Sequence, residues 1–171
     1  MLAQLQNSLS PHRFTHSLGV METAVRLAKV YLADVPSCRL AGMLHDCAKG
    51  LGQSDMLKLI ERQGISLYRG EESYPGLLHA PAGAALAKEQ YGVSDEEVLS
   101  AIRKHTLGAP QMSLIDDIIF VSDFIEPNRE PFEGLEEVRK AAFEDLNRAK
   151  VLCRAHTARY CEQRGLPVFS F

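Results

Sequence analysis

The chain of 171 residues contains no tryptophan, and its four cysteines lack the C-x-x-C spacing of a zinc knuckle or a redox pair. No apolar run approaches the roughly 18 residues of a membrane-spanning helix. The amino terminus lacks the basic region and small-residue cleavage site of a secretory signal. Long basic runs are also missing, and the formal net charge is −3, which disfavours nucleic acid and anionic membranes as partners. These absences predict a cytoplasmic protein with reduced cysteines.

The composition fits one compact domain. Hydrophobic residues make up 46% of the chain and charged residues 24%, and a chain of this length can bury one sizeable core. Internal repeats, low-complexity tracts and β-hairpin signals are missing from the sequence, whereas apolar residues recur at helical spacing. We therefore predict an all-α fold, a single-domain helical bundle over residues 1–171. Its motif core is expected at about 10–130 and its carboxy-terminal helices at 133–165.

Helix starts and ends are indicated by serine, proline and glycine. Ser10 followed by Pro11 begins the clearest helix, with an apolar stripe at Phe14, Leu18, Met21, Val25, Ala28 and Leu32. The expected helices run from Ser10-Pro11 to about Leu32, from Pro36-Ser37 to Gly50-Gly52, from Ser54 to Gly64, from Pro81 to Gly92, from the capping-box pattern Ser94-Asp95-Glu96-Glu97 to His105, and from Ser113 to Pro127. One or two further helices are expected between Leu135 and Arg164.

Two segments fall outside this periodicity. The stretch from Ile65 to Leu78 is long enough for a functional loop, either a lid or a wall of a substrate site. The end of the chain carries an apolar tail at Val168, Phe169 and Phe171, which docks on its own domain or forms a dimer contact.

The chemistry of the chain is indicated by the adjacent pair His45-Asp46. The pair follows Leu44 on an apolar segment, where an ionised carboxylate is costly unless it is paired or bound to a metal. Imidazole and carboxylate together bind first-row divalent ions, and two such ions can hold a phosphate and activate water. Further candidate ligands come from different expected elements, with His79 just before the helix at Pro81, as facing helices of a bundle core supply them; they are His16, His79, His105 and Asp123. His12 and His156 are left out of this set.

The order of these residues resembles a known family. The chain shows, in sequence, Arg13-Phe14-Thr15-His16-Ser17, His45-Asp46-Cys47-Ala48-Lys49, His79-Ala80-Pro81-Ala82-Gly83, His105-Thr106 and Asp123-Phe124-Ile125-Glu126-Pro127-Asn128-Arg129. These blocks resemble the HD-domain metal-dependent phosphohydrolases, and within them the small YqeK-like family of symmetrical bis(5'-nucleosyl)-tetraphosphatases. The resemblance runs from Arg13 to Arg129 and continues weakly into the last helices.

This resemblance implies a site with two metal ions, usually described with iron, that cleaves diadenosine tetraphosphate into two ADP. Manganese, cobalt or another first-row metal also fits such ligands. The family's ligand positions correspond to His16, His45, Asp46, His79, His105 and Asp123. Asp46 would bridge the two metals, and the loop from Ile65 to Leu78 would influence base preference. A homodimer is compatible with this picture.

Basic residues complete the expected site. A tetraphosphate is strongly anionic, and phosphoryl transfer needs positive charge near the oxygens; the candidates are Lys49, Arg13 and Arg129. We expect Lys49, Asp46 and Arg129 to be catalytic, and Arg13, Lys49, Gly83, Thr106 and Arg129 to contact substrate. For Thr106 a helix-capping role, and for Gly83 close packing of a neighbouring helix, are the alternatives.

Other functions stay open at this stage. Another HD phosphohydrolase would act on nucleoside monophosphates, dNTPs or cyclic nucleotides, and a non-catalytic nucleotide-binding module would be expected to have lost ligand residues. The intervening histidines and the Glu126-Pro127-Asn128-Arg129 block favour the tetraphosphatase. The cysteines are expected in the core, with Cys47, between Asp46 and Lys49, as the one that oxidation would affect if it were exposed.

Overall fold

A computed structural model describes residues 1–166 and 168 of the chain, and within these residues the secondary structure is helical, with no strand. The all-α prediction is confirmed. In chain order the helices are α1 (Leu2–Ser8), α2 (Pro11–Tyr31), α3 (Val35–Leu44), α4 (Gln53–Arg62), the 3-10 turns η1 (Glu71–Ser73) and η2 (Pro75–Leu77), α5 (His79–Tyr91), α6 (Glu96–Lys104), α7 (Leu114–Ile125), α8 (Leu135–Glu144) and α9 (Leu146–Gln163).

The best-predicted helix starts are those with a serine cap. Ser10 accepts a hydrogen bond from the backbone N–H of Arg13, and Pro11 fills the first helical position of α2. Ser113 caps α7 in the same way and forms a complete capping box with Asp116. Both starts were predicted from sequence and are confirmed.

Several predicted boundaries are wrong. Helix α3 begins at Val35 because the Asp34 carboxylate accepts the N–H of Ser37, and it ends at Leu44, well before the glycines expected to stop it. Helix α4 begins after Gly52, so Ser54 lies inside the helix and does not cap it. The early end of α3 matters for function because it places the His-Asp pair in the turn that follows the helix.

Differences also occur at other ends. Leu32, expected on the apolar stripe, is the C-cap of α2 in the left-handed region at φ 55° and is 92% exposed. Asp95 alone caps α6 by accepting from Glu97 N, so the expected capping box does not form there. Helix α1, which carries the buried Leu5, was not predicted. The last segment forms two helices because Asp145 ends α8 and caps α9.

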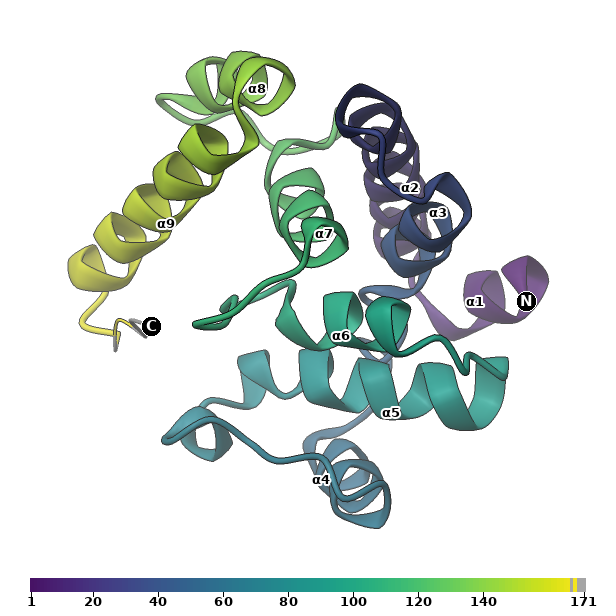
Figure 1. Cartoon of the computed structure of the whole chain (residues 1–171). Helices are drawn as coiled ribbons and strands as arrows, with labels where there is room; N and C mark the ends of the chain where they lie inside the picture. Colours follow the sequence, from purple (N-terminus) through teal and green to yellow (C-terminus); the bar gives the residue numbers. More distant parts are fainter. Residues whose placement is uncertain (167, 169–171) are drawn as a thin grey trace.

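The apolar helix α7 lies in the middle of the bundle, between α2 and α9, and it also contacts α3 and α6 (Figure 1). Helix α6, which contacts α7, also packs against α5, and α4 packs on α5. Buried aspartates at the start of α7 are neutralised by lysines of other helices: Lys104 Nζ lies 2.6 Å from Asp116 and Lys150 Nζ 2.6 Å from Asp117. These pairs explain how an otherwise apolar helix tolerates two carboxylates.

The loop from Ile65 to Leu78 is anchored to α6. Glu71 is 1% exposed, and its carboxylate accepts two hydrogen bonds from Arg103, at 3.0 and 2.7 Å. It also accepts the backbone N–H of Tyr68, and the Arg103 guanidinium lies 4.1 Å from the centre of the Tyr68 ring. This anchoring favours a fixed wall over a lid.

Cys38, Cys47 and Cys153 are buried, as expected, whereas Cys161 is partly exposed. Cys47 is 1% exposed, its thiol donates to the carbonyl of Gly83, and burial raises the pKa of the Cys47 thiol. Oxidation at Cys47 is therefore disfavoured.

None of the helices in the described part of the chain is long and apolar enough to cross a membrane. Of the apolar tail, Phe169 and Phe171 lie outside the described residues, and Val168 is 46% exposed.

Candidate metal centre

The structure brings together the ligand candidates from different helices. His16 lies on α2, His45 and Asp46 follow α3, His79 begins α5, His105 is the C-cap of α6, and Asp123 lies on α7. Except for His16 and Asp123, which are partly exposed, these side chains are buried. The early end of α3 and the first turn of α5 place imidazoles at helix ends, where their rings can turn toward a common centre.

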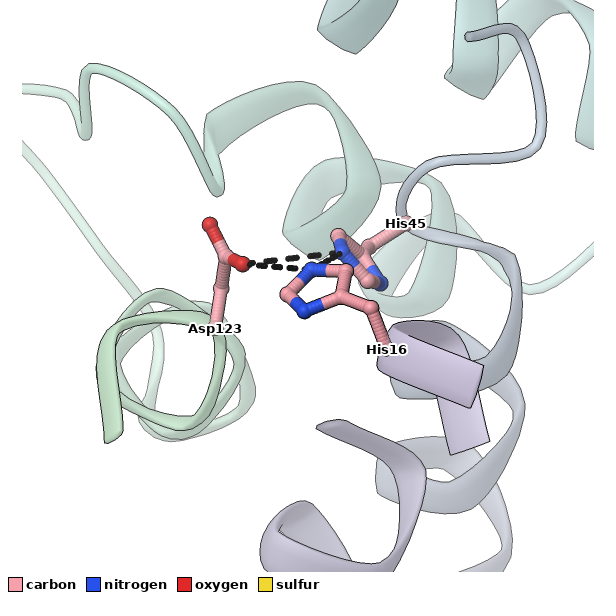
Figure 2. A group of neighbouring side chains, drawn as sticks. All are labelled: His16, His45 and Asp123. Carbon is pink, nitrogen blue, oxygen red and sulfur yellow. Dashed lines mark hydrogen bonds and ion pairs between the residues drawn. The ribbon is translucent and has the colours of Figure 1, made fainter. Parts of the chain in front are cut away.

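One group of donors joins α2, the α3 turn and α7. His16 Nε2 lies 3.0 Å from Asp123 Oδ1 and 3.2 Å from His45 Nε2. Asp123 Oδ1 lies 3.7 Å from His45 Nε2. Figure 2 shows the Asp123 carboxylate facing the rings of both histidines. The three donor atoms lie within 4.8 Å of one another, close enough to hold a single ion.

A second group lies beside the first. His79 Nε2 is 3.1 Å from His105 Nε2, and Asp46 Oδ1 is 3.3 Å from His79 Nε2 and 3.6 Å from His105 Nε2. The same Asp46 oxygen lies 3.9 Å from His45 Nε2, which belongs to the first group. Asp46 therefore lies between the two groups of histidines.

Backbone carbonyls fix the orientation of three of the rings. The Nδ1 atoms of His45, His79 and His105 each face a carbonyl oxygen three residues earlier, at 2.8, 2.7 and 2.7 Å, in Gly42, Gly76 and Ile102. A carbonyl oxygen only accepts, so Nδ1–H donates and Nε2 keeps its lone pair. His16 Nδ1 instead faces the Glu126 carboxylate at 3.1 Å.

This arrangement fits a bound cation. Two Nε2 lone pairs that face each other at 3.1 Å, as in His79 and His105, repel unless a positive charge lies between them. Ligand nitrogens about 2.0 to 2.1 Å from one ion are themselves about 3 Å apart when they occupy neighbouring positions around it. The donor set of imidazole and carboxylate suits first-row divalent metals.

The electrostatics of most of these groups suit metal binding at neutral pH. Burial lowers the pKa of His79 to about 3 and lowers the pKa of His45, so both rings are neutral ligands. Burial alone would raise the pKa of Asp46 and of Asp123, but the neighbouring histidines lower both values below the usual range. For His16, burial opposes protonation, and the contacts with Asp123 and Glu126 nevertheless raise its pKa.

The two aspartates of the site differ in their surroundings. The Asp123 side chain is 23% exposed, whereas that of Asp46 is 6% exposed. Asp46 also forms an ion pair with Arg13, whose Nη1 lies 3.5 Å from Asp46 Oδ2.

The basic residues surround this centre. Arg129 Nη1 lies 3.9 Å from Asp123 Oδ1. Burial lowers the pKa of Lys49; Asp46 and Asp123 act in the opposite direction, and the charges of Arg13 and Arg129 add to the lowering. The three cations are thus close enough to influence one another, which matches a site for a multiply charged anion.

The two remaining candidates for substrate contact, Thr106 and Gly83, differ in position. Thr106 Oγ1 lies 3.3 Å from His79 Nε2 and 3.2 Å from His105 Nε2, so it faces the centre. Gly83 is buried, and a Cβ there would lie 3.2 Å from Ile102 and 3.3 Å from the carbonyl of His45. For Gly83, close approach of neighbouring segments is therefore the alternative that the geometry supports.

The sequence reasoning missed two groups. Glu126 belongs to the motif from Asp123 to Arg129, in which the sequence predicted roles for Asp123 and Arg129 but none for Glu126. Arg103 and Glu71, which hold the loop from Ile65 to Leu78, carried no local signal. His156, set aside as part of a charged helix, packs its ring against Phe132 with centroids 5.3 Å apart.

The chain is similar to proteins of known family. Residues 13–155 match the family model of the HD domain. The chain belongs to the HD-domain family. A Halalkalibacterium halodurans protein named symmetrical bis(5'-nucleosyl)-tetraphosphatase is 45% identical over 165 residues, with 94% of this chain and 85% of that protein covered. A Bacillus subtilis protein of the same name is 40% identical over 168 residues, with 98% and 89% covered.

A solved HD-domain structure has the same fold. The crystal structure of a predicted HD superfamily hydrolase involved in NAD metabolism, from Clostridium acetobutylicum, matches with a TM-score of 0.93 and 43% identity. The match covers 98% of this chain and 88% of that one. The family resemblance and the helical fold expected from the sequence motifs are confirmed.

Proposed function

We propose that this HD-domain protein is a metal-dependent hydrolase that cleaves diadenosine tetraphosphate symmetrically into two ADP. The observation that carries the proposal is the position of Asp46, whose Oδ1 lies 3.3 Å from His79 Nε2 and 3.9 Å from His45 Nε2, between two groups of histidines. This geometry suits a carboxylate shared by two ions. The names of the two bacterial relatives support the choice of substrate.

Two ions are proposed, held by His16, His45 and Asp123 on one side and by His79 and His105 on the other, with Asp46 shared. Iron is our first choice, and manganese or cobalt would suit the same donors. When bound, such ions would supply Lewis-acid charge to phosphoryl oxygens and lower the pKa of water.

The side chains of the protein then bind and orient the substrate. Arg13, Lys49 and Arg129 would hold the anionic phosphate chain, and Lys49 and Arg129 would stabilise charge that develops on its oxygens. Thr106 Oγ1, close to His79 and His105, is placed to donate to a phosphate oxygen. The anchored loop from Ile65 to Leu78 would influence which base is accepted.

A substrate panel tests this proposal. Purified protein with added Fe²⁺, Mn²⁺ or Co²⁺ would be incubated with diadenosine tetraphosphate, nucleoside monophosphates, dNTPs, cyclic nucleotides, NAD and a single-stranded oligonucleotide, and the products would be separated by chromatography. NAD is included because the Clostridium acetobutylicum relative is described as a hydrolase involved in NAD metabolism. We expect diadenosine tetraphosphate to react fastest, and faster hydrolysis of a monophosphate or of NAD would overturn the proposal.

Further parts of the proposal concern the whole chain. We propose one domain over residues 1–171, with the motif core at about 10–130 and the helices at 133–165 completing it. We also propose a cytoplasmic location. The net charge of −3 supports a small-molecule substrate over a nucleic-acid partner. A homodimer stays part of the proposal and is tested by light scattering.

A further inference from the structure

Glu126 is a buried carboxylate next to the metal centre. It follows the last residue of α7 and is 1% exposed. Its Oε1 accepts a hydrogen bond from His16 Nδ1 at 3.1 Å, and its Oε2 accepts from Asn128 N at 2.7 Å and from Asn128 Nδ2 at 3.1 Å. Each carboxylate oxygen therefore has a different partner, and one of these partners is a ligand candidate.

The opposite side of the Glu126 carboxylate rests against the backbone of α2. A Cβ built on Gly19 would lie 2.3 Å from Glu126 Oε2 and 3.0 Å from Asn128 Nδ2. No side chain fits at position 19 unless the carboxylate moves. Because Gly19 is one helical turn after His16, the glycine lets Glu126 reach the imidazole on the same helix.

The backbone of Glu126 is held as firmly as its side chain. Arg139 of α8 donates from Nε to the carbonyl of Ile125 at 3.1 Å and from Nη2 to the carbonyl of Glu126 at 2.9 Å. These bonds satisfy carbonyls at the end of α7 that have no partner inside the helix. A residue of the carboxy-terminal helices thus fixes the turn that carries the carboxylate.

We propose that Glu126 is a positioning residue for the metal centre: its carboxylate holds the Nδ1–H of His16, so that Nε2 is fixed as the ligand atom and made more basic. The proposal deepens the proposed function and rests on its metal centre, not on its substrate. His45, His79 and His105 each use a neutral carbonyl for the same purpose. His16 alone among these ligand candidates uses a carboxylate, which is the stronger acceptor.

Glutamine cannot replace Glu126 in this position. The carboxylate accepts from three N–H groups, whereas a carboxamide has one acceptor oxygen and a donating NH₂ group. If its oxygen faces His16, its NH₂ faces the N–H groups of Asn128; if it turns around, its NH₂ opposes the Nδ1–H of His16. E126Q therefore keeps the size of the side chain and loses its hydrogen-bonding pattern.

Metal affinity is the direct test. Mn²⁺ would be titrated into metal-free protein and the free ion measured by electron paramagnetic resonance, with helical circular dichroism of the metal-free protein as the check on folding. We expect E126Q to stay folded and to bind Mn²⁺ about 10 to 100 times more weakly than the parent. The matched control is E130Q, the same change at an exposed glutamate four positions later, which should bind like the parent.

A second variant approaches the same contact from the other side. G19A keeps the glutamate at position 126, but the added methyl group pushes its Oε2 away. We expect a similar loss of Mn²⁺ affinity, and this test does not depend on whether E126Q folds. G52A is its control, since a methyl group there meets only Asp55 Oδ2 at 3.9 Å. The double variant G19A/E126Q should bind Mn²⁺ no more weakly than whichever single variant has the lower affinity, because both substitutions break the same contact between Glu126 and His16.

The outcomes separate the two proposals. If the parent binds no Mn²⁺, the metal centre itself is wrong. Parent-like Mn²⁺ binding by a folded E126Q or by G19A would overturn the role of Glu126 and leave the metal centre intact. The same conclusion would follow if the fold losses of Mn²⁺ affinity in the two single variants multiplied in the double variant.

Discussion

Arg13 Nη1 lies 3.5 Å from Asp46 Oδ2, while the other oxygen of the same carboxylate lies 3.3 Å from His79 Nε2. One aspartate thus contacts both a cation at the edge of the site and a histidine inside it. The Arg13 side chain is 44% exposed, so it can reach a ligand from solvent and still lie beside the metal centre. This relationship explains why the Arg13 motif and the His45-Asp46 motif belong to one site.

Removal of a ligand candidate should remove metal and activity together. In D46A and H45A the metal content, measured by elemental analysis after gel filtration, should fall well below that of the parent, because the remaining histidines lose an anionic partner or a donor. D55A, at an exposed aspartate of α4, is the control and should keep its metal. Full activity of D46A in chelator-treated buffer would contradict the metal centre.

Removal of a basic residue should slow turnover and leave the fold and the metal in place. For K49A and R129A we expect a decrease in kcat of about 100- to 1000-fold, or about 2.7 to 4 kcal/mol, as for other fixed donors to developing charge. K58A, a lysine whose side chain is 73% exposed, serves as the control. If K49A or R129A loses its helical circular dichroism at room temperature, the residue is structural and its assigned role is wrong.

The metal-free protein should lose stability as the pH falls. The pKa of His79 is about 3 in the folded state, because of burial, and about 6.5 in the unfolded chain. Between these values the unfolded state binds the extra proton, so the free energy of unfolding falls with decreasing pH, by at most about 1.4 kcal/mol per pH unit for this group. Urea titrations of the parent and of H79Q between pH 4 and pH 7 measure this, and an equal slope in both proteins would contradict it.

The anchor of the loop from Ile65 to Leu78 should be visible in hydrogen exchange. R103M leaves the buried Glu71 carboxylate without its cation, which should destabilise the protein by about 3 to 5 kcal/mol and speed exchange of the loop amides. R62M breaks an exposed pair with Glu89 and should have little effect. Adding E71Q to R103M should recover part of the loss; unchanged exchange in R103M would show that the loop is held by other contacts.

Local patterns predicted the fold best where one residue decides the outcome. The helix starts predicted at Ser10 and Ser113 are correct, because an N-cap needs only the serine side chain and the backbone N–H groups of the next turn. Ser54 was wrong because Gly52 is the N-cap of α4, so the helix begins at Gln53 and the serine falls inside it. Such competition between neighbouring starts depends on packing, which the sequence alone does not display.

The site shows the same division. The choice of the ligand candidates, from different helices, followed from the His45-Asp46 pair and from the family motifs. The partners of these residues did not: His16 and Glu126 are 110 positions apart, and Arg103 and Glu71 are 32 apart. No periodicity connects such positions, and only the tertiary fold places them together.

The position of phosphate cleavage tests the central claim most directly. Diadenosine tetraphosphate would be hydrolysed in ¹⁸O-labelled water, and the products of the first few per cent of reaction would be separated and weighed by mass spectrometry. We predict ADP as the sole nucleotide product, with one labelled oxygen in one of the two ADP molecules from each cleavage, because attack at a central phosphorus breaks the middle bridge. AMP and ATP in equal amounts would contradict the symmetrical hydrolysis that we propose.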